Sequence, residues 1–348
     1  MPTRGLHRRT VLMGAFGLVG GLVGGLGVAG CTAAGSPTAS GPQSTPTLTT
    51  PTPATHQSWT FRAMTYNILS GARPPSAFPR VEPRDLLFEN RLPVLAEWIT
   101  HASPDVLGIQ ENERMRAPIH RPLRRLLPLL DGYRAVQADT NIPIVYRAAA
   151  FEPLASGIRV ISTQRHVRYG TWCRLRHSTT GDQILVANTH LDPHQGEDVV
   201  RVREASLTTL VAWLATINED PNLPLVLCGD FNSPNDRDPD GHIHGMAPLY
   251  ESGLRNSADI AAAITSAVPG AATLNGMGAA VDGIWRYGAI RHDARMIDYI
   301  WVSPDVEVRA WQVITGPSIR TIGGQPYFAA GPVPSDHCPV LAEVRIGA

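Results

Sequence analysis

The stretch Leu225-Val-Leu-Cys-Gly-Asp230-Phe-Asn232-Ser-Pro234 is the most informative part of this chain for its fold. The apolar run 223–229 has the length and composition of a buried β-strand, and it ends in an acid and an amide. On an extended segment, Asp230 and Asn232 are two residues apart and point to one face. The stretch therefore predicts a strand with chemically useful side chains at its carboxyl end.

Five further segments have the same form, because each is or follows an apolar run and ends in acids, amides or histidines. They are Met-Thr-Tyr-Asn67, Gly-Ile-Gln-Glu111, Asn-Thr-His190-Leu-Asp192, Met-Ile-Asp298-Tyr and Ser-Asp336-His337. A lone Asp or Asn after a strand is usually a turn or cap residue. Six such segments in one chain indicate instead that the strand ends converge on one rim and form an active site.

The segments between these strand ends alternate between helical and extended patterns. Leu92, Leu95 and Ile99 recur at three- and four-residue spacing, which predicts a helix over 85–101. We also expect helices over 116–130 and 197–218, and strands over 61–67, 106–111, 142–146, 169–176, 183–188, 223–229, 297–302 and 339–346. Helices that alternate with strands favour packed sheets with helices outside them, a layered α/β domain.

The composition is that of a globular protein, with 43% hydrophobic and 17% charged residues. The formal net charge is zero. Removal of residues 1–30 takes away three of the 30 basic residues and no acid, which leaves a net charge of −3. A protein that grips long nucleic acid usually has a basic excess. We therefore expect no stable nucleic-acid partner.

The N-terminus has the pattern of a bacterial export signal over residues 1–30. His7-Arg-Arg-Thr-Val-Leu12 is a twin-arginine start, and an uncharged stretch follows it to Gly30. Val28-Ala-Gly-Cys31 resembles the lipobox of lipoproteins, in which Cys31 is lipidated and becomes the membrane anchor. The alternative is an uncleaved membrane span of about 20 residues, but the many glycines of this stretch make a poor helix.

The predicted organisation beyond the signal is a linker and one catalytic domain. Residues 31–58 are rich in Ser, Thr and Pro and are expected to be disordered, and the domain is expected to span 59–346. It would lie at the outer face of the cytoplasmic membrane as a lipoprotein, or be secreted, and we expect a monomer. Buried thiols are expected for Cys173, Cys228 and Cys338, although an exported protein can form one disulfide among them.

The polar side chains of the six segments are those that metal-assisted phosphoester hydrolysis requires. A phosphoester repels nucleophiles, so catalysis needs a cation, a base that activates water and donors for the transition state. Hard ions such as Mg²⁺ prefer carboxylate and amide oxygens, which Glu111, Asp336 and Asn67 offer. His337 directly follows Asp336, so the two share a site only at a strand end or bulge. Asp298 can pair with His337 and favour its protonated form.

The six segments, in this order, resemble the endonuclease/exonuclease/phosphatase superfamily over residues 59–346. The resemblance implies a four-layer α/β/β/α sandwich, in which two mixed β-sheets pack face to face with helices outside. It also implies a Mg²⁺-dependent hydrolase of phosphoester bonds, with Mn²⁺ as an alternative ion. His190 stands where the deoxyribonuclease and sphingomyelinase branches carry histidine and abasic-site enzymes carry tyrosine, which disfavours the abasic-site branch.

The resemblance further assigns a role to each candidate residue. The metal positions are those of Asn67, Glu111 and Asp336, and the phosphate contact is that of His190. Water activation and stabilisation of the phosphoryl group fall to Asp230 and Asn232. The last catalytic residue is His337, with which Asp298 pairs. Tyr169-Gly-Thr-Trp172-Cys-Arg174 resembles a less characterised bacterial branch, in which Trp172 and Arg174 flank the site. The alternative for these two is a core tryptophan and a surface arginine.

The leading functional hypothesis is a lipid-anchored phosphoesterase that cleaves a phosphodiester or phosphomonoester by attack of activated water. One alternative is an extracellular nuclease, and another is a surface binding protein on the same scaffold. The sequence does not name the substrate, because loops such as 233–246 decide it, and it does not fix the number of metal ions. His242 and His244 in that loop can contact substrate or a second metal, or they can be solvated.

Overall fold

The computed structural model describes residues 58–70, 76, 78, 81–113, 121–277, 279–281, 284–290, 296–317, 319–328 and 332–347. The expected export signal, Cys31 and almost all of the expected linker lie outside these residues. Contacts divide the chain into Met1–Pro53 and Ala54–Ala348, and only the second unit contains described residues. Within the described part of the chain, no helix is long and apolar enough to cross a membrane.

The first large sheet contains six strands in the order β13-β16-β1-β2-β4-β3. Its central strands β1 and β2 run parallel, and its other neighbours pair antiparallel. The strands are β1 (Trp59–Asn67), β2 (Val106–Gln110), β3 (Tyr133–Val136), β4 (Ile144–Arg147), β13 (Glu307–Val313) and β16 (Val340–Ile346). β1 and β2 are buried over nearly their whole length, as expected of central strands covered on both faces.

The second large sheet also contains six strands, in the order β5-β6-β7-β8-β12-β9. Here β7 and β8 run parallel and the other neighbours antiparallel. The strands are β5 (Phe151–Ser162), β6 (Arg168–His177), β7 (Gln183–His190), β8 (Leu225–Asp230), β9 (Arg255–Asn256) and β12 (Asp298–Val302). The turn between β6 and β7 is the hairpin that Thr179-Thr-Gly-Asp182 predicts.

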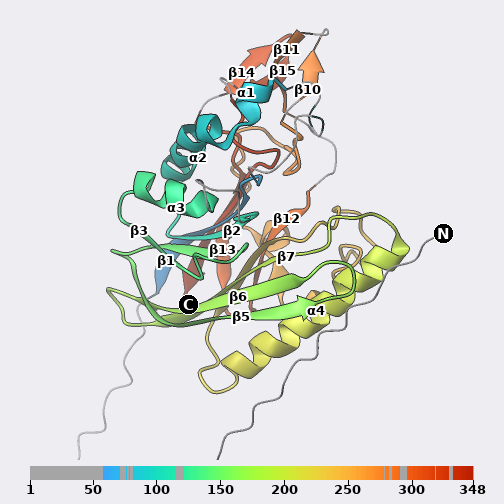
Figure 1. The fold of residues 1–348 in the computed structure, drawn as a ribbon. Coiled ribbons are helices and arrows are strands. Elements are labelled where there is room, and N and C mark those ends of the chain that lie inside the picture. Colours follow the sequence, from blue (N-terminus) through green and yellow to red (C-terminus); the bar gives the residue numbers. More distant parts are fainter. Residues whose placement is uncertain are drawn as a thin grey trace, which may run out of the picture. The chain divides into compact units, whose positions relative to one another are not determined.

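Alternate residues of β8 show how the layers are built. Val226 and Cys228 belong to the apolar core between the two sheets, whereas Leu225 and Leu227 pack in a second core beneath α4 (Glu197–Asn218). On the other side, α2 (Phe88–Ala102) covers the first sheet, with Leu95 and Ile99 fully buried. Figure 1 shows α2 and α4 on opposite sides of the paired sheets. The predicted four-layer α/β/β/α sandwich is confirmed.

Two helical predictions need correction. The helix expected over 85–101 is divided into α1 (Pro83–Leu86) and α2, because Leu87 between them has extended dihedral angles. The helix expected over 116–130 is only α3 (Pro122–Leu126) followed by a 3₁₀ turn (Leu127–Leu129), and 114–120 lie outside the described residues. Pro128 has no amide hydrogen with which to continue α3. The helices α5 (Ala247–Glu251) and α6 (Ser257–Ile260) were not predicted.

A third, smaller sheet was also not predicted. It has the order β10-β11-β15-β14, with strands β10 (Ala279–Val281), β11 (Ile284–Ala289), β14 (Ile319–Ile322) and β15 (Gln325–Phe328). In Figure 1 it stands beside α1, away from α4. Its strands are too short to show a clear alternation of apolar and polar residues, which explains why the sequence pattern misses them.

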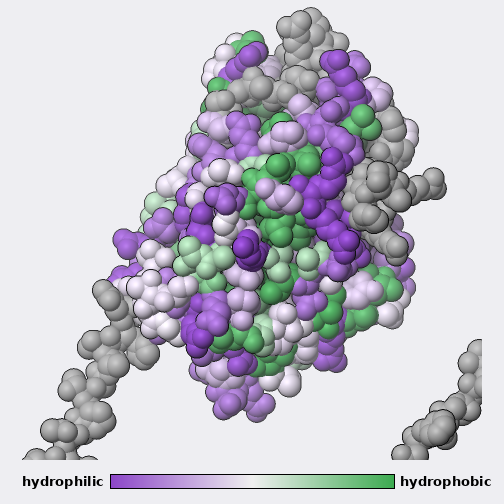
Figure 2. Space-filling model, turned by 60° about the vertical axis from the view of Figure 1, so that its left-hand side comes forward, coloured by the Kyte–Doolittle hydropathy of each residue, from purple (hydrophilic) through white to green (hydrophobic). Residues whose placement is uncertain are grey.

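The surface is mixed in character. Figure 2 shows hydrophobic side chains reaching one face in patches among hydrophilic ones. Among the described residues, the exposed large hydrophobic side chains are Leu87, Leu129, Leu154, Ile158, Val160, Val167, Ile264, Ile319 and Ile322. Because they are spread over several elements, they do not by themselves identify a binding surface.

Candidate active site

The registers of β7, β8 and β12 explain why three candidate side chains meet. Asp230, the last residue of β8, pairs in register with His190 of β7 on one side and with Asp298 of β12 on the other. Side chains of directly opposite residues lie on the same face of a sheet. That face is turned toward the first sheet, since Val226 and Cys228, which share it with Asp230, belong to the core between the sheets.

Asp230 is the centre of the site. Its carboxylate is 1% exposed, and its Oδ2 accepts a hydrogen bond from Asn67 Nδ2 at 2.9 Å. The same oxygen lies 3.5 Å from His190 Nε2 and 3.8 Å from His337 Nε2. Asn67 comes from the end of β1, so this hydrogen bond joins the two sheets. One buried carboxylate is thus surrounded by an amide and two imidazoles from strand ends far apart in the sequence.

His337 lies between carboxylates, which favour the positively charged form of its imidazole. Its Nδ1 lies 2.9 Å from Asp298 Oδ2, the pairing that the sequence suggested. Burial by itself would lower the pKa of His337, but the Asp298 and Asp230 carboxylates outweigh burial and raise that pKa well above its ordinary value. His337 is therefore protonated at neutral pH, and its Nε2 faces the Asp230 carboxylate at 3.8 Å.

His190 has the opposite character. Burial lowers its pKa below the ordinary value, although the Asp230 carboxylate acts against that shift. Burial and the nearby Asp298 raise the pKa of Asp230, whereas the two histidines act to lower it. The site therefore combines a neutral imidazole, a charged imidazole and a carboxylate whose proton affinity is raised, which is the pattern of groups prepared for acid–base chemistry.

Glu111 and Asp336 lie beside this centre on the side of the first sheet. Glu111 Oε1 accepts a hydrogen bond from Asn67 Nδ2 at 3.2 Å, and its Oε2 accepts one from the Ser70 amide at 2.7 Å. Ser335, which precedes Asp336, donates from Oγ to the Asn67 carbonyl oxygen at 2.7 Å. Asp336 and His337 lie in the segment before β16, so both can reach one cleft although they are consecutive.

The site contains donors that fit a divalent ion. Glu111, Asp336 and Asn67 offer hard oxygen ligands, as Mg²⁺ and Mn²⁺ require. A second grouping consists of Asp230, Asp298 and His337, whose donor atoms lie within 4.8 Å of one another. His337 suits this second grouping poorly, because its Nδ1 already bonds Asp298 and its raised pKa keeps Nε2 protonated. The oxygen-only set is the better match.

The backbone at two site residues lies in the left-handed region. Glu111 has φ 62° and Asn232 has φ 53°. Such values are uncommon for residues other than glycine and often occur at functional sites. The expectation of an extended Asp230–Asn232 segment is therefore wrong. The two side chains share the cleft because the chain turns after β8, where Asp230 Oδ1 accepts a hydrogen bond from the Asn232 amide at 3.0 Å.

A cleft of about 690 Å³ is lined by six of the candidate residues, Glu111, His190, Asp230, Asn232, Asp336 and His337, whereas the buried Asn67 and Asp298 do not line it. Nine of its lining residues were not singled out from the sequence, and eight of them are Ser70, Glu113, Asn141, His166, Val167, Pro193, Leu274 and Ile297. Arg168, at the start of β6, also lines it and was missed. Its Nε is buried, and within the described part of the chain the Arg168 side chain has no hydrogen-bond or ion-pair partner. An arginine without a partner inside a cleft is a ready contact for an anion.

Arg91 was also missed, because a single arginine in an amphipathic helix gives no signal. It is fully buried and donates to the carbonyl oxygens of Ile68 at 3.1 Å, Leu69 at 3.0 Å and Pro334 at 2.6 Å. Burial lowers its pKa to about 10, so it remains charged at neutral pH. The guanidinium thus ties together the segments that follow Asn67 and precede Asp336.

Trp172 and Arg174 do not line the cleft, so the expectation that they flank it is wrong. On β6, Thr171 and Cys173 face the core between the sheets, and alternate residues therefore face α4. Trp172 packs in the core beneath α4 and would lie 2.7 Å from a Cβ atom placed on Gly157. Arg174 lies on the same outer face and is half-buried, with its Nε buried.

The remaining candidates have structural surroundings. Cys173, Cys228 and Cys338 are free, buried thiols, as the main expectation had it. His242 stacks on Tyr250 with ring centroids 4.0 Å apart, and His244 is exposed. Neither histidine lines the cleft.

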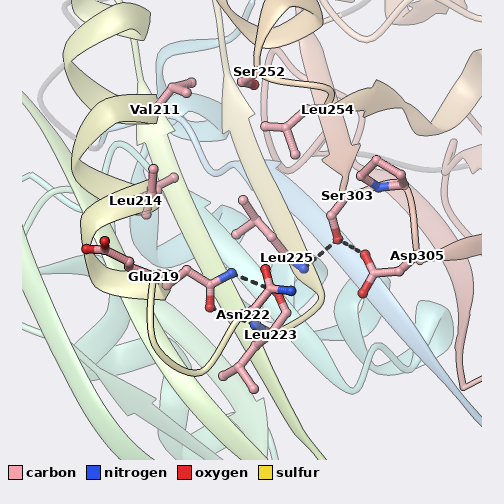
Figure 3. A pocket seen from close by; sticks show the side chains of 13 residues that line it. Val211, Leu214, Glu219, Asn222, Leu223, Leu225, Ser252, Leu254, Ser303 and Asp305 are labelled. Atoms are coloured by element: carbon pink, nitrogen blue, oxygen red, sulfur yellow. Dashed lines mark hydrogen bonds between the residues drawn. The ribbon is translucent and has the colours of Figure 1, made fainter.

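A second hollow, of about 510 Å³, lies at the other end of β8. Leu214 of α4, Leu225 and Leu254 line it together with several polar residues, as Figure 3 shows. Two of its polar side chains are hydrogen-bonded together: Ser303 Oγ accepts from the Leu225 amide at 2.8 Å and donates to Asp305. It contains no histidine and no group of acids comparable to that around Asp230.

Comparisons with known proteins agree with this architecture. The structure of an endonuclease/exonuclease/phosphatase family protein from Bacteroides thetaiotaomicron has a TM-score of 0.63 and 20% identity, covering 84% of this chain and 96% of that one. The mannosyl-6-phosphatase of the same organism has a TM-score of 0.61 and 21% identity, covering 82% and 99%. ANGEL2, a 2',3'-cyclic phosphatase, in complex with adenosine-2',3'-vanadate has a TM-score of 0.56 and 18% identity, covering 84% and 97%.

At these identities the structural likeness establishes the fold alone. No curated protein matches the sequence. The model of the Endonuclease/Exonuclease/phosphatase family, however, matches residues 64–337, which include every candidate residue from Asn67 to His337. The chain therefore belongs to the endonuclease/exonuclease/phosphatase family.

Proposed function

We propose that the protein hydrolyses a phosphoester by attack of water that Asp230 activates. The observation that carries the proposal is the position of Asp230 Oδ2, with Asn67 Nδ2 at 2.9 Å, His190 Nε2 at 3.5 Å and His337 Nε2 at 3.8 Å. A buried carboxylate of raised pKa is a suitable acceptor for a proton from water. Asn67 orients the carboxylate and leaves its other oxygen toward Asn232.

The donors around Asp230 would stabilise the phosphoryl group. Protonated His337 offers a charged donor, and neutral His190 offers a second imidazole N–H from the neighbouring strand. Such donors are most effective where charge develops on the phosphoryl oxygens in the transition state. Asp298 holds the His337 ring and balances its charge. Arg168 is the residue best placed to contact a substrate anion in the cleft.

A divalent ion, which we propose to be Mg²⁺ with Mn²⁺ as a substitute, would be held by Glu111, Asp336 and Asn67. When bound, it supplies positive charge to a phosphoryl oxygen and helps to neutralise the reacting group. Arg91 fixes the two segments that carry these ligands, since it bonds to carbonyl oxygens on both. Within this scheme the protein contributes the positions of the ligands, and those positions depend on the first sheet, where Asn67 ends β1, Glu111 follows β2 and Asp336 precedes β16.

The substrate is either a phosphomonoester or a phosphodiester. The neighbours named as a mannosyl-6-phosphatase and a 2',3'-cyclic phosphatase act on different phosphoesters, which supports the reaction class and leaves the substrate open. The catalytic set also weighs against a purely binding role, because binding alone would not require carboxylates buried beside one another. The alternative is an extracellular nuclease, and a substrate panel distinguishes it from an esterase of small phosphoesters.

The test is a substrate panel assayed with Mg²⁺ and with excess chelator. The panel contains bis-nitrophenyl phosphate, nitrophenyl phosphate, a hexose 6-phosphate, sphingomyelin and plasmid DNA. We expect hydrolysis of at least one small phosphoester, loss of that activity in chelator and its return with Mg²⁺ or Mn²⁺. Full activity in excess chelator would reject the metal-assisted mechanism, and preferential cleavage of DNA would favour the nuclease.

We also propose that the catalytic domain is exported and anchored by lipid on Cys31. The support is the twin-arginine start and the lipobox-like Val28-Ala-Gly-Cys31. Cys31→Ser should release the protein from membranes or block its processing, while the turnover of the purified protein stays unchanged. Wild-type protein that is freely soluble outside the cell and cleaved well away from Cys31 would reject the anchor.

A further inference from the structure

The candidate active site is divided between the two sheets. Asn67 ends β1, Glu111 follows β2, and Asp336 and His337 precede β16, all strands of the first sheet, whereas His190, Asp230 and Asp298 lie on strands of the second. The spacing between these two halves is therefore a spacing between sheets. Apolar packing holds the sheets together, but it is not directional and does not by itself fix their relative position to a fraction of an ångström. Directional contacts across the interface are needed for that.

Two buried amides make such contacts directly beneath the site. Gln110 ends β2, immediately before Glu111, and Asn188 lies on β7, two residues before His190. Both side chains are 0% exposed, and neither lines the cleft. Gln110 Nε2 donates to Asn188 Oδ1 at 2.7 Å, which is a direct hydrogen bond from the first sheet to the second.

Asn188 directs all of its side-chain hydrogen bonds across the interface. Besides accepting from Gln110, its Nδ2 donates to the carbonyl oxygens of Ile109 at 2.8 Å and Pro143 at 3.0 Å. Ile109 belongs to β2, and Pro143 directly precedes β4, so both acceptors are on the first sheet. Asn188 is also in register with Cys228, two residues before Asp230. The same side chain is therefore tied to the strands that carry Glu111, His190 and Asp230.

The backbones approach closely at this point. A Cβ atom placed on Gly108 of β2 would lie 2.7 Å from Cys228 Cβ and 2.9 Å from Asn188 Cγ. Only glycine allows the first sheet to come so near to β7 and β8. The two amides therefore lie where a small shift of one sheet against the other would also move the strand ends that carry the site residues.

Stability alone does not account for this arrangement. Gln110 Oε1 is buried and, within the described part of the chain, has no hydrogen-bond partner. An apolar side chain of similar volume would avoid the cost of that buried acceptor. A polar contact kept at such a cost is better explained by the geometry that it imposes.

We propose that Gln110 and Asn188, the amide pair, are positioning residues that set the distance between the metal-binding half of the site on the first sheet and the half on the second sheet that carries His190 and Asp230. The pair does not touch substrate. It acts through Glu111 on one sheet and through His190 and Asp230 on the other. This inference rests on the proposed function, because the two halves are defined by their proposed roles.

The test compares Gln110→Met, Asn188→Leu and the double variant in the full-length protein. Ile184→Ala is the matched control, since Ile184 lies on β7, faces the same core and is fully buried, but is six residues from His190. Turnover and KM are measured on the best small substrate of the panel. Two further measurements do not depend on activity. They are the Mn²⁺ affinity, by titration calorimetry, and the melting temperature.

We expect each amide variant to lower kcat by roughly tenfold to a hundredfold, as displacement of catalytic groups by about 1 Å does. Mn²⁺ affinity should fall by about tenfold, in line with the loss of groups that orient metal ligands. The double variant should lose little more than the worse single variant, because the two amides act as one unit. Ile184→Ala should lower the melting temperature and leave kcat and Mn²⁺ affinity unchanged.

The inference is overturned if the amide variants behave as Ile184→Ala does, with a lower melting temperature but unchanged kcat and Mn²⁺ affinity. Additive losses in the double variant would overturn it as well. If Asn188→Leu does not fold, Gln110→Met decides, because it conserves volume and leaves both donors of Asn188 bonded. If the wild type cleaves no phosphoester, the proposed function fails separately, and Mn²⁺ affinity still decides whether the amide pair sets the spacing.

Discussion

The two ends of β8 lie in one strand and yet have opposite characters. At the Leu225 end, leucines line a hollow, and polar atoms nearby are hydrogen-bonded, as the Leu225 amide is to Ser303 Oγ (Figure 3). At the Asp230 end, a carboxylate is buried beside a second carboxylate, Asp298, and between two histidines. The first end is packed as a stable core is, whereas the second buries two carboxylates whose negative charges repel each other, beside histidines that partly offset that repulsion.

The difference indicates which end carries the function. Burial and Asp298 raise the pKa of Asp230, which means that its ionised form is disfavoured in the folded protein relative to the unfolded one. The stability associated with the protonated form is present at low pH and lost as the pH rises through the raised pKa. Residues that reduce stability at a cleft are usually kept for activity. Substitutions at the Asp230 end should therefore change turnover, and substitutions at the Leu225 end should change stability.

The largest effect is expected for His337→Ala, which removes the charged imidazole. Turnover should fall by about two orders of magnitude or more, as is usual for an acid–base residue. The assay is steady-state hydrolysis at saturating Mg²⁺ and neutral pH, together with circular dichroism to confirm folding. His244→Ala is the control, because His244 is exposed and does not line the cleft. Equal turnover in the two variants would remove His337 from the mechanism.

A smaller effect is expected for Asp298→Asn, since Asp298 acts through His337. Turnover at neutral pH should fall by roughly tenfold. The Asp298 carboxylate raises the pKa of His337, and the protonated form is lost as the pH rises through that raised pKa. Without the carboxylate the pKa falls, so the alkaline limb of the pH–rate profile should move to lower pH. A limb that stays in place would show that a group other than His337 determines it.

The smallest effect on turnover is expected at the other end of β8, for Leu214→Ala. Leu214 is 2% exposed and lines the hollow near Leu225. Its truncation should lower the free energy of unfolding by about 2–5 kcal/mol, as large-to-small core substitutions do. Turnover per folded molecule should stay within about twofold of the wild type, because additivity holds for distant sites. Denaturant titration and a turnover assay at low temperature check both statements.

The sequence predicted the layered fold and the candidate side chains because both depend on local patterns. A buried run that ends in Asp230 or Asn67 is visible in a few residues, and the order of six such runs identified the family. Pairings across sheets have no such signal. Arg168 and Arg91 look like ordinary surface arginines until the cleft and the carbonyl oxygens around them are known. Trp172 was misplaced because the pattern does not tell which face of a strand points to the site.

Asp230→Asn tests the central claim most directly. The substitution conserves the shape of the side chain and removes the carboxylate that we propose activates water. Turnover at saturating Mg²⁺ should fall by at least about a hundredfold, while the melting temperature changes by only a few degrees, because a disfavoured buried charge is lost together with one hydrogen-bond acceptor. Near-normal turnover in folded Asp230→Asn protein would contradict the account.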